Sequence, residues 1–139
     1  MSFHLLALTP AGVYFDKNVE EVYFPTPNGP LGIFSGYTRL RFTLAPSGVL
    51  KFKEEGKEKY YAIFGGLVSV EPTKVTILSE DIEDGMSIDM ANAIASRDRA
   101  ADFINGKDPN VDVDRARAAL NHALTQIDAK SLAEGGRKS

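Results

Sequence analysis

Two histidines and one run of acidic residues are the side chains whose types could support metal or acid–base chemistry. His4 and His122 are far apart in the chain, and no carboxylate pair of the metal-site type stands beside either of them in the sequence. The acidic run, residues 80–84, lacks the interleaved turn residues of a loop that binds hard cations. We therefore interpret both histidines as structural and the acidic run as a charged linker, and we predict no metal site.

Nucleophilic and nucleotide-processing motifs are also missing from the sequence. The chain has no cysteine, which excludes disulfides and thiolate chemistry, and it contains no GxSxG element, P-loop or Rossmann glycine set. Gly65 and Gly66 stand between two strand patterns, where a tight turn or a bulge brings backbone close to backbone. The sequence therefore predicts no catalytic residue, and an enzyme is the least favoured class of protein.

Two segments have the composition of binding sites. Residues 28–40 combine three glycines and a proline with a short apolar core. This fits either an irregular strand with its loops or a shaped contact loop on a rigid scaffold. Residues 88–99 begin with Ile88 and Asp89 and end with Arg99. An aspartate in the first turn of a helix complements the helix dipole, and this explains Asp89 without a ligand.

The elements that must position these segments change in character near Gly85. Six of the seven prolines and twelve of the thirteen Phe and Tyr residues precede it. This part contains short runs rich in Val, Ile, Tyr and Phe, separated by turn residues, and several runs alternate apolar with charged positions. The pattern predicts an antiparallel β-sandwich, or flattened barrel, of about nine to ten strands. The predicted strands are residues 3–8, 13–16, 19–24, 32–34, 40–45, 49–53, 59–64, 67–70 and 75–79.

After Gly85 the apolar period becomes helical. Ser87 is the predicted N-cap of a helix over residues 88–104, and Gly106 is suited to a left-handed position after its end. Asp112 is the predicted cap of a second helix over residues 113–132, and the short connection predicts an antiparallel hairpin. The predicted seam consists of Ile88, Ala91, Ile94, Ala95, Ala101 and Ile104 on the first helix, and of Val113, Ala116, Leu120, Ala123 and Ile127 on the second.

The predicted fold class is therefore α+β, with a sandwich over residues 1–86 and a helical hairpin over residues 87–139. A net charge of −3 without a polybasic run argues against nucleic acid as a partner, and no segment has the roughly 20 apolar residues of a membrane-inserted helix. Because the hairpin seam is mostly alanine, its burial barely offsets the entropy cost of ordering it. The hairpin is either a fixed tail or an element that undocks and extends.

Several blocks of the sandwich resemble the epsilon subunit family of F-type ATP synthases. Residues 31–37, LGIFSGY, resemble the family signature GELGIYPGHAPLL, and VEEV at 19–22 resembles the segment before it. PSGVL at 46–50, IFGGLV at 63–68 and VTIL at 75–78 match three later blocks. The order and spacing of the blocks hold through the sandwich, and the hairpin follows where the family has it.

The resemblance implies a non-catalytic subunit of the central stalk, the rotor of the synthase. In that role the sandwich binds the gamma subunit with one face and directs the loop at residues 29–39 toward the c-ring, which couples ion flow to ATP synthesis elsewhere. The hairpin inhibits ATP hydrolysis when it extends toward the alpha/beta catalytic hexamer. The implied rotor-interface residues are Gly29, Pro30, Leu31, Gly36, Tyr37, Thr38 and Arg39. In this loop Pro30 replaces the family's Glu, Tyr37 its His and Thr38-Arg39 its Ala-Pro.

The start of the first helix resembles a nucleotide-binding motif of some family members, I/L-D-x-x-R-A. Here it reads IDMANA from Ile88 onward, and Arg99 matches a later arginine of the family. Because Asn92 replaces the motif arginine, one guanidinium partner for a phosphate is lost. We therefore predict weak or absent ATP binding and no other cofactor.

Arg115 and Arg117 on the second helix are, by the same resemblance, candidates for contact with acidic segments of the beta subunits. Our interpretation is that most of their interaction energy comes instead from Asp112 and Asp114, three residues earlier. The resemblance also implies a peripheral protein at the cytoplasmic face of a plasma membrane, with a plastid thylakoid as the alternative. A bacterial origin is favoured over a mitochondrial one because no transit-peptide pattern precedes Met1.

A second class of function is a free-standing β-sandwich module that binds a sugar or lipid and carries a helical dimerisation tail. Such a module needs a groove lined by aromatic side chains. Phe52, Tyr60, Tyr61 and Phe64 are the aromatic residues that could line one, but their strand positions make them better candidates for the core.

Overall fold

The chain folds into a β-sandwich followed by a helical hairpin, and the computed structural model describes residues 2–36, 38–106, 109–110 and 112–135. Within these residues the sandwich contains ten strands, which confirms the predicted α+β class. The strands are β1 (Phe3–Thr9), β2 (Gly12–Val19), β3 (Glu21–Thr26), β4 (Gly29–Phe34), β5 (Leu40–Thr43), β6 (Gly48–Glu54), β7 (Lys57–Ile63), β8 (Leu67–Val70), β9 (Lys74–Leu78) and β10 (Ile82–Asp84).

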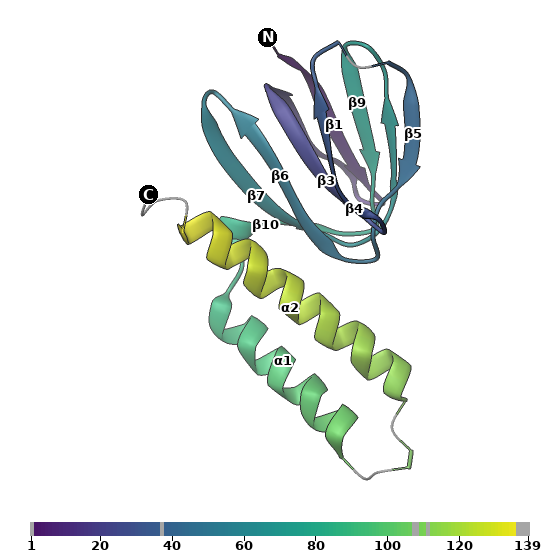
Figure 1. Cartoon of the computed structure of the whole chain (residues 1–139). Coiled ribbons are helices and arrows are strands. Elements are labelled where there is room, and N and C mark those ends of the chain that lie inside the picture. Colours follow the sequence, from purple (N-terminus) through teal and green to yellow (C-terminus); the bar gives the residue numbers. More distant parts are fainter. Residues whose placement is uncertain (1, 37, 107–108, 111, 136–139) are drawn as a thin grey trace.

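Two five-stranded sheets form the layers of the sandwich. The first sheet has the order β2-β1-β9-β8-β5, and the second has the order β10-β7-β6-β3-β4. The pairing is antiparallel, as predicted, with a local exception where β1 runs parallel to β9. This parallel pair places the first strand of the chain beside the ninth and joins the two halves of the first sheet (Figure 1).

The core lies between the sheets because successive side chains of each strand point to opposite faces. Val22 and Phe24 on β3, and Leu50 and Phe52 on β6, are fully buried. Lys51, between the last two, faces outward. This is the alternation that the sequence predicted. Each large apolar side chain buried in this way stabilises the fold by about 1.5–3 kcal/mol.

Gly66 stands just before β8, where its backbone comes very close to the end of the neighbouring strand β9. Its φ angle is +128°, and a methyl group at this position would overlap the carbonyl oxygen of Leu78. Its own carbonyl oxygen accepts a hydrogen bond of 2.9 Å from the backbone N–H of Leu44. The predicted close approach of backbone to backbone is confirmed at Gly66, whereas Gly65 has no such contact among the described residues.

The acidic run at residues 80–84 is partly a strand, so its interpretation as a charged linker is wrong. Residues 82–84 form β10, which pairs antiparallel with β7, and Ile82 is buried in the sandwich core. This segment has three residues, two of them acidic, so it is too short and too polar to show a strand pattern in the sequence. Backbone pairing to β7 and the burial of Ile82 determine the conformation instead.

A 3-10 turn, η1 (Gly85–Ser87), connects the sandwich to helix α1 (Met90–Asn105). The N-cap of α1 is Asp89, whose carboxylate accepts a hydrogen bond of 3.2 Å from the backbone N–H of Asn92. The prediction of Ser87 as the cap is therefore wrong, because η1 contains that residue. Asp89 offers a stronger, charged acceptor to the free N–H groups of the first turn.

The ends of the helices differ in how well the sequence predicted them. Gly106 follows α1 with φ −74°, an extended conformation, so the left-handed position predicted for it is wrong. Helix α2 (Val113–Gly135) starts where it was predicted. Its cap is also confirmed, because the carboxylate of Asp112 accepts a hydrogen bond of 3.1 Å from the backbone N–H of Arg115.

The seam between the helices uses smaller residues than predicted. On α1 the buried residues are Ala93 and Ala100, whereas Ile94 is 36% exposed and Ala91 and Ala95 are exposed. Ile88 is buried, but it precedes the helix, and Ala101 and Ile104 are half-buried. On α2, Ala116 and Ala123 are buried as predicted, Leu120 and Ile127 are half-buried, and Val113 is exposed. The seam therefore rests on alanines, which let two helices approach closely but bury little apolar area.

Helix α2 packs against the second sheet, and α1 packs mainly against α2. Figure 1 shows α2 crossing below β6 and β7, with the far ends of both helices pointing away from the sandwich. A small apolar cluster at this junction is separate from the sandwich core. Its buried members are Ala62, Ile88, Ala93 and Ala129, and Val49, Phe64 and Ile127 pack against them. We call this set the docking cluster.

Candidate interaction surface

An apolar row crosses the outer face of the first sheet. The pairing register aligns Leu67 with Leu78, Leu78 with Leu8 and Leu8 with Val13, so these four residues of β8, β9, β1 and β2 are neighbours on one face. Leu67 is 56% exposed, Leu78 50% and Val13 65%. We call Val13, Leu8, Leu78 and Leu67 the apolar row. Contiguous exposed apolar side chains of this kind mark surfaces that bind proteins or other apolar partners.

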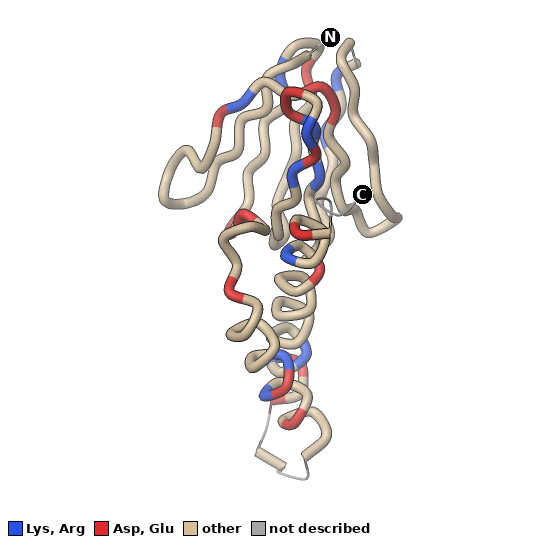
Figure 2. The backbone as a smooth tube through the Cα atoms, turned by 90° about the vertical axis from the view of Figure 1, so that its left-hand side faces the viewer, with Lys and Arg blue, Asp and Glu red and all other residues tan. Residues whose placement is uncertain are grey.

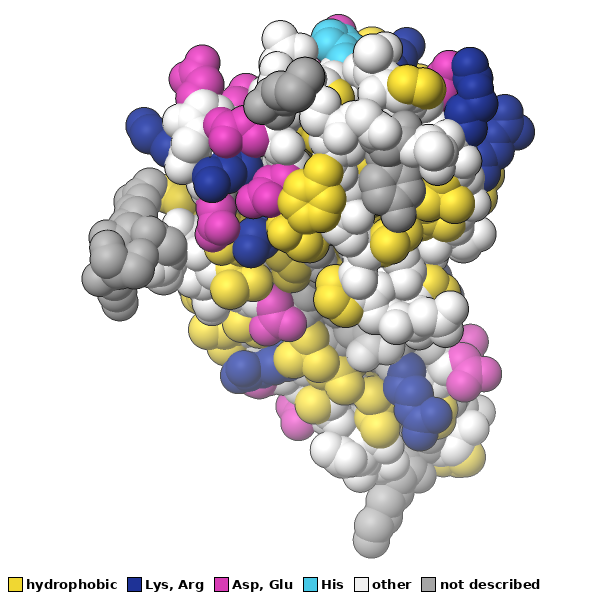
Figure 3. Space-filling model, turned by 45° about the horizontal axis from the view of Figure 1, so that its top comes forward, with side chains coloured by type: hydrophobic (Ala, Val, Ile, Leu, Met, Phe, Trp, Pro, Cys, Tyr) yellow, Lys and Arg dark blue, Asp and Glu magenta, His cyan; other side chains and the backbone are white. Residues whose placement is uncertain are grey.

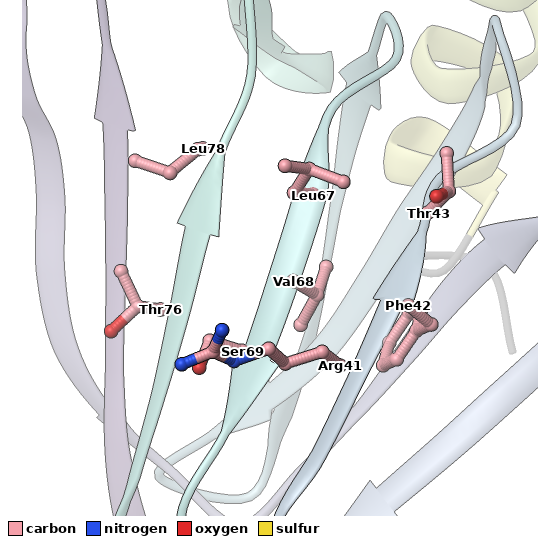
Figure 4. Close-up of a pocket in the computed structure, with 8 residues that line it drawn as sticks. All are labelled: Arg41, Phe42, Thr43, Leu67, Val68, Ser69, Thr76 and Leu78. Atoms are coloured by element: carbon pink, nitrogen blue, oxygen red, sulfur yellow. The ribbon is translucent and has the colours of Figure 1, made fainter.

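A polar row runs beside the apolar one. Arg41 aligns with Ser69, and Ser69 aligns with Thr76. Figure 4 shows these side chains and the two leucines of the row around one shallow pocket, carried by β5, β8 and β9. The guanidinium and the two hydroxyls can donate hydrogen bonds at the rim of an apolar contact. This combination of an apolar centre and a polar rim is the anatomy of a protein–protein interface.

The opposite outer face of the sandwich is partly occupied. Helix α2 contacts β6 and β7 of the second sheet and covers the docking cluster there. In the view of Figure 3, charged and hydrophobic side chains are interspersed over the upper surface of the sandwich. Among the described residues, the apolar row of the first sheet is a contiguous apolar surface of the sandwich that no other element covers.

The predicted rotor-interface residues do not form one loop. Gly29 and Pro30 pair with Thr26 and Pro25 in the β3–β4 hairpin, and Leu31 follows them on β4. These residues form the first half of β4, and Gly36 follows the end of that strand, about 17 Å of extended chain after Leu31. The structure therefore divides the predicted loop into two groups at opposite ends of β4.

The second group lies between β4 and β5. Gly36 has φ +81° in the turn, and Thr38 and Arg39 lead into β5; Tyr37 falls outside the described residues. The guanidinium of Arg39 lies 3.3 Å from a carboxylate oxygen of Glu71. Both side chains are largely exposed, so this ion pair adds little stability. The charged groups of Arg39 and Glu71 therefore remain available to a binding partner.

The residues at the start of α1 are engaged in structure. Ile88 belongs to the docking cluster, and the carboxylate of Asp89 caps the helix. Asn92 and Arg99 are exposed and seven residues apart, which puts them on the same side of α1 two turns from each other. An arginine at position 92 would lie on the same side of α1 as Arg99, whereas Asn92 supplies no charge to a phosphate.

Arg115 and Arg117 are exposed near the start of α2. The favoured interpretation, that they pair with Asp112 and Asp114, is wrong for the side chains. No ion pair joins these four described residues, and the Asp112 carboxylate caps the helix through the backbone N–H of Arg115. Both guanidinium groups are therefore unengaged by the acids next to them.

A third group of side chains converges at the junction of sandwich and hairpin, and sequence reasoning missed it. Asp81, Glu83 and His122 place one ligand atom each within 4.8 Å of one another. His122 thus has two carboxylates beside it in space, although none stands beside it in the sequence. A spacing of about forty residues carries no motif, since the docking of α2 alone brings the histidine to the acids.

Two tyrosines beside this junction have raised pKa values. Burial is the main reason that the pKa of Tyr61 is raised, and the carboxylate of Asp84 adds to the effect. Burial also raises the pKa of Tyr14, whose hydroxyl oxygen accepts a hydrogen bond of 3.1 Å from the backbone N–H of Asp84. Both phenols are therefore neutral at physiological pH and act as packing and hydrogen-bonding groups.

Comparison with known proteins places the sandwich in a defined family. The family model described as the β-sandwich domain of the ATP synthase delta/epsilon chain matches residues 2–85. The chain belongs to the ATP synthase epsilon chain family. It is 35% identical to the ATP synthase epsilon chain of Bacillus velezensis over 87% of this chain and 91% of that protein. It is also 35% identical to the epsilon chain of Caldanaerobacter subterraneus, over 91% of both chains.

Solved structures share the fold of this epsilon-family chain. A chain in the cryo-EM structure of the Euglena gracilis mitochondrial ATP synthase, OSCP/F1/c-ring, matches with a TM-score of 0.80 and 22% identity, over 92% of this chain and 81% of that one. A chain in the Tetrahymena thermophila central stalk and c-ring structure matches with a TM-score of 0.57 and 17% identity, over 94% and 95%. At these identities the likeness shows that the two-part fold is shared.

Proposed function

We propose that this chain is the non-catalytic epsilon subunit of the central stalk in an F-type ATP synthase, and that the apolar row of its first sheet binds the gamma subunit. The exposed row carries the proposal, since its four apolar side chains are contiguous and no other described element covers them. Membership of the epsilon chain family supports the gamma subunit of the central stalk as the partner. Rotation then requires packed surfaces that transmit torque, and no covalent chemistry.

The c-ring and the alpha/beta hexamer are the other proposed partners. Gly29, Pro30 and Leu31 lie with Thr43 around one hollow, and Thr43 aligns with Leu67 at the end of the apolar row. This group therefore extends the proposed rotor surface around the edge of the sandwich. Arg115 and Arg117 on α2 would meet acidic segments of the hexamer when the hairpin extends.

The hairpin is proposed to inhibit ATP hydrolysis. Its alanine seam and small docking cluster bury little apolar area, so undocking has a low cost. Figure 2 shows that both signs of charge occur along the helices. We expect this of an element that is exposed to water in both its docked and its extended state. Within the described residues no helix is long and apolar enough to cross a membrane. We propose attachment to the cytoplasmic face of a plasma membrane, or to a thylakoid, through the partner subunits.

The alternative function, a sugar- or lipid-binding module, has less support. The rings of Phe52 and Tyr61 pack against each other in the sandwich core with centroids 5.3 Å apart, and Phe64 stacks on His122. Tyr60 donates a hydrogen bond of 2.8 Å to Glu58 on the same strand. The four aromatic side chains that such a groove would need are therefore used in packing and in a strand contact.

The test is binding of the chain to purified gamma subunit. Replacing Leu67 and Leu78 by serine should weaken binding by at least about tenfold, or 1.4 kcal/mol, with little change in stability because both side chains are exposed. Leu132→Ser, an exposed leucine on α2, is the matched control and should bind as the parent does. Unchanged binding by the Leu67/Leu78 variant would contradict the assignment of this face.

A further inference from the structure

The junction between sandwich and hairpin carries a set of metal-ligating groups from three segments. Asp81 precedes β10, Glu83 lies on β10, and His122 lies in the middle of α2. The imidazole Nε2 of His122 is 3.7 Å from a carboxylate oxygen of Asp81, and all three ligand atoms lie within 4.8 Å of one another. In a tetrahedral site with bonds of about 2.0–2.2 Å, neighbouring ligand atoms are about 3.3–3.6 Å apart. The distance between His122 and Asp81 is close to this value, and a small side-chain adjustment of about one ångström brings Glu83 to it.

Neighbouring residues hold the side chains of His122 and Glu83 and the backbone of Asp81 in place. The ring of His122 stacks on Phe64 with centroids 4.0 Å apart and an interplanar angle of 13°. The backbone carbonyl oxygen of Asp81 accepts a hydrogen bond of 3.1 Å from the N–H of Phe64. One carboxylate oxygen of Glu83 accepts a hydrogen bond of 2.9 Å from the side chain of Gln126. Orientation by neighbours of this kind raises the affinity of a ligand set for its metal.

We propose that Asp81, Glu83 and His122 bind a zinc ion, with water completing the coordination. One imidazole and two carboxylates suit zinc, whereas magnesium and calcium prefer oxygen ligands alone. Excess negative charge at the site favours a cation, because Glu80 and Asp84 flank the ligands.

Such an ion would link the hairpin to the sandwich. Two of its ligands belong to the sandwich and the third to α2, so the complete ligand set exists when the hairpin is docked. An ion that binds the docked form more tightly shifts the equilibrium toward that form by mass action. Zinc would therefore oppose extension of the hairpin. This consequence rests on the proposed mobility of the hairpin, whereas zinc binding itself does not.

The chain offers a matched control histidine. His4 pairs with a carboxylate oxygen of Asp16 in the sandwich, and like His122 it is partly exposed. The described residues place no second carboxylate ligand beside it. His4→Gln therefore removes an imidazole with one acidic partner, whereas His122→Gln removes an imidazole with two.

The experiment titrates the full-length chain with ZnCl₂ by calorimetry and with CoCl₂ by visible absorption. We expect one saturable site and a Co²⁺ absorption band that zinc displaces. His122→Gln and Asp81→Asn should each weaken binding by more than about tenfold, and His4→Gln should leave it unchanged. Absence of a saturable site in the parent chain, parent-like binding by His122→Gln, or an equal loss in His4→Gln would each overturn the proposal.

A second measurement tests the link to the hairpin. Hydrogen exchange of the backbone amides in α2 should slow when zinc saturates the parent chain, and it should be unaffected by zinc in His122→Gln. Zinc binding without slower exchange in α2 would overturn the link and leave the ion site in place. Failure of the gamma-binding test would not affect either result, so the two proposals fail independently.

Discussion

Gly85 lies so close to Ala129 that a methyl group on Gly85 would come within 2.7 Å of the Ala129 carbonyl oxygen. On its other side the same methyl group would come within 2.6 Å of the Tyr60 carbonyl oxygen. Gly85 therefore sits between the backbone of β7 and that of α2, at the point where the chain leaves the sandwich. The docked hairpin requires a residue without a side chain here.

Gly85→Ala should release the hairpin from the sandwich. Neither contact involves a flexible side chain, so the helix must move away, at a cost of about 1–3 kcal/mol. Hydrogen exchange and limited proteolysis should show α2 less protected while β3 and β6 keep their protection. Gly135→Ala is the control, because an added methyl group there meets nothing within 4 Å. Equal protection of α2 in both variants would contradict the tight packing of Gly85.

Truncation after Asp84 should abolish inhibition and keep assembly. The cut leaves β10 paired with β7 and removes both helices, so both sheets stay complete. ATP hydrolysis by an epsilon-depleted ATP synthase should be lower with the full chain than with the truncated one. Identical hydrolysis rates with the two forms would show that the hairpin of this chain is not inhibitory.

Asn92→Arg should create or strengthen ATP binding. The parent chain is expected to bind ATP with a Kd above about 1 mM, and a second guanidinium beside Arg99 should raise the affinity about tenfold. Calorimetry with the isolated chain measures both values. The gain should disappear when Arg99→Ala is added to Asn92→Arg, since both positions lie on one side of α1. Micromolar binding of ATP by the parent chain would contradict the prediction.

Tyr61→Phe should flatten the loss of stability at alkaline pH. Burial raises the folded-state pKa of Tyr61 above the ordinary value of about 10. The protonated phenol therefore contributes stability that is complete below about pH 10 and is lost as the pH rises toward the folded pKa. Urea unfolding at pH values from 8 to 12 measures the free energy of unfolding of the parent chain and of the variant. The slope of this free energy against pH should show that the variant releases up to about one proton fewer on unfolding.

At a pH below the tyrosine titration, the same substitution should lower the stability of the fold. Removing the hydroxyl eliminates its interaction with Asp84, which should cost about 1 kcal/mol at pH 8. Tyr60→Phe is the control, because the less buried phenol of Tyr60 should give a smaller change in pH dependence. Parallel stability curves for the parent and Tyr61→Phe across the alkaline range would contradict the role of burial.

Several parts of the fold were predictable because local chemistry determines them. The alternation on β3 and β6 fixed which side chains enter the core, since one face of each strand is apolar. The cap Asp112 was predictable because its carboxylate bonds within one turn. The choice of Asp89 over Ser87 was not, because η1 takes up Ser87 before the helix starts.

The candidate sites were less predictable than the fold. Leu67, Leu78 and Val13 look like ordinary strand residues in the sequence, and their common exposure depends on which strands are neighbours. The predicted interface loop at residues 29–39 crosses a whole strand, and a linear motif does not show that its two ends are far apart. The group formed by Asp81, Glu83 and His122 carries no spacing signal at all.

The sequence by itself determined the two-part architecture, because strand and helix periods are properties of neighbouring residues along the chain. The tertiary structure decided which alanines form the helix seam, which apolar side chains stay in water, and which histidine meets two acids. Ala93 and Ala100 are buried while Ile94 is exposed because α2 already packs on the sandwich and presents one face to α1. Such choices depend on contacts between residues distant in sequence, which no local pattern records.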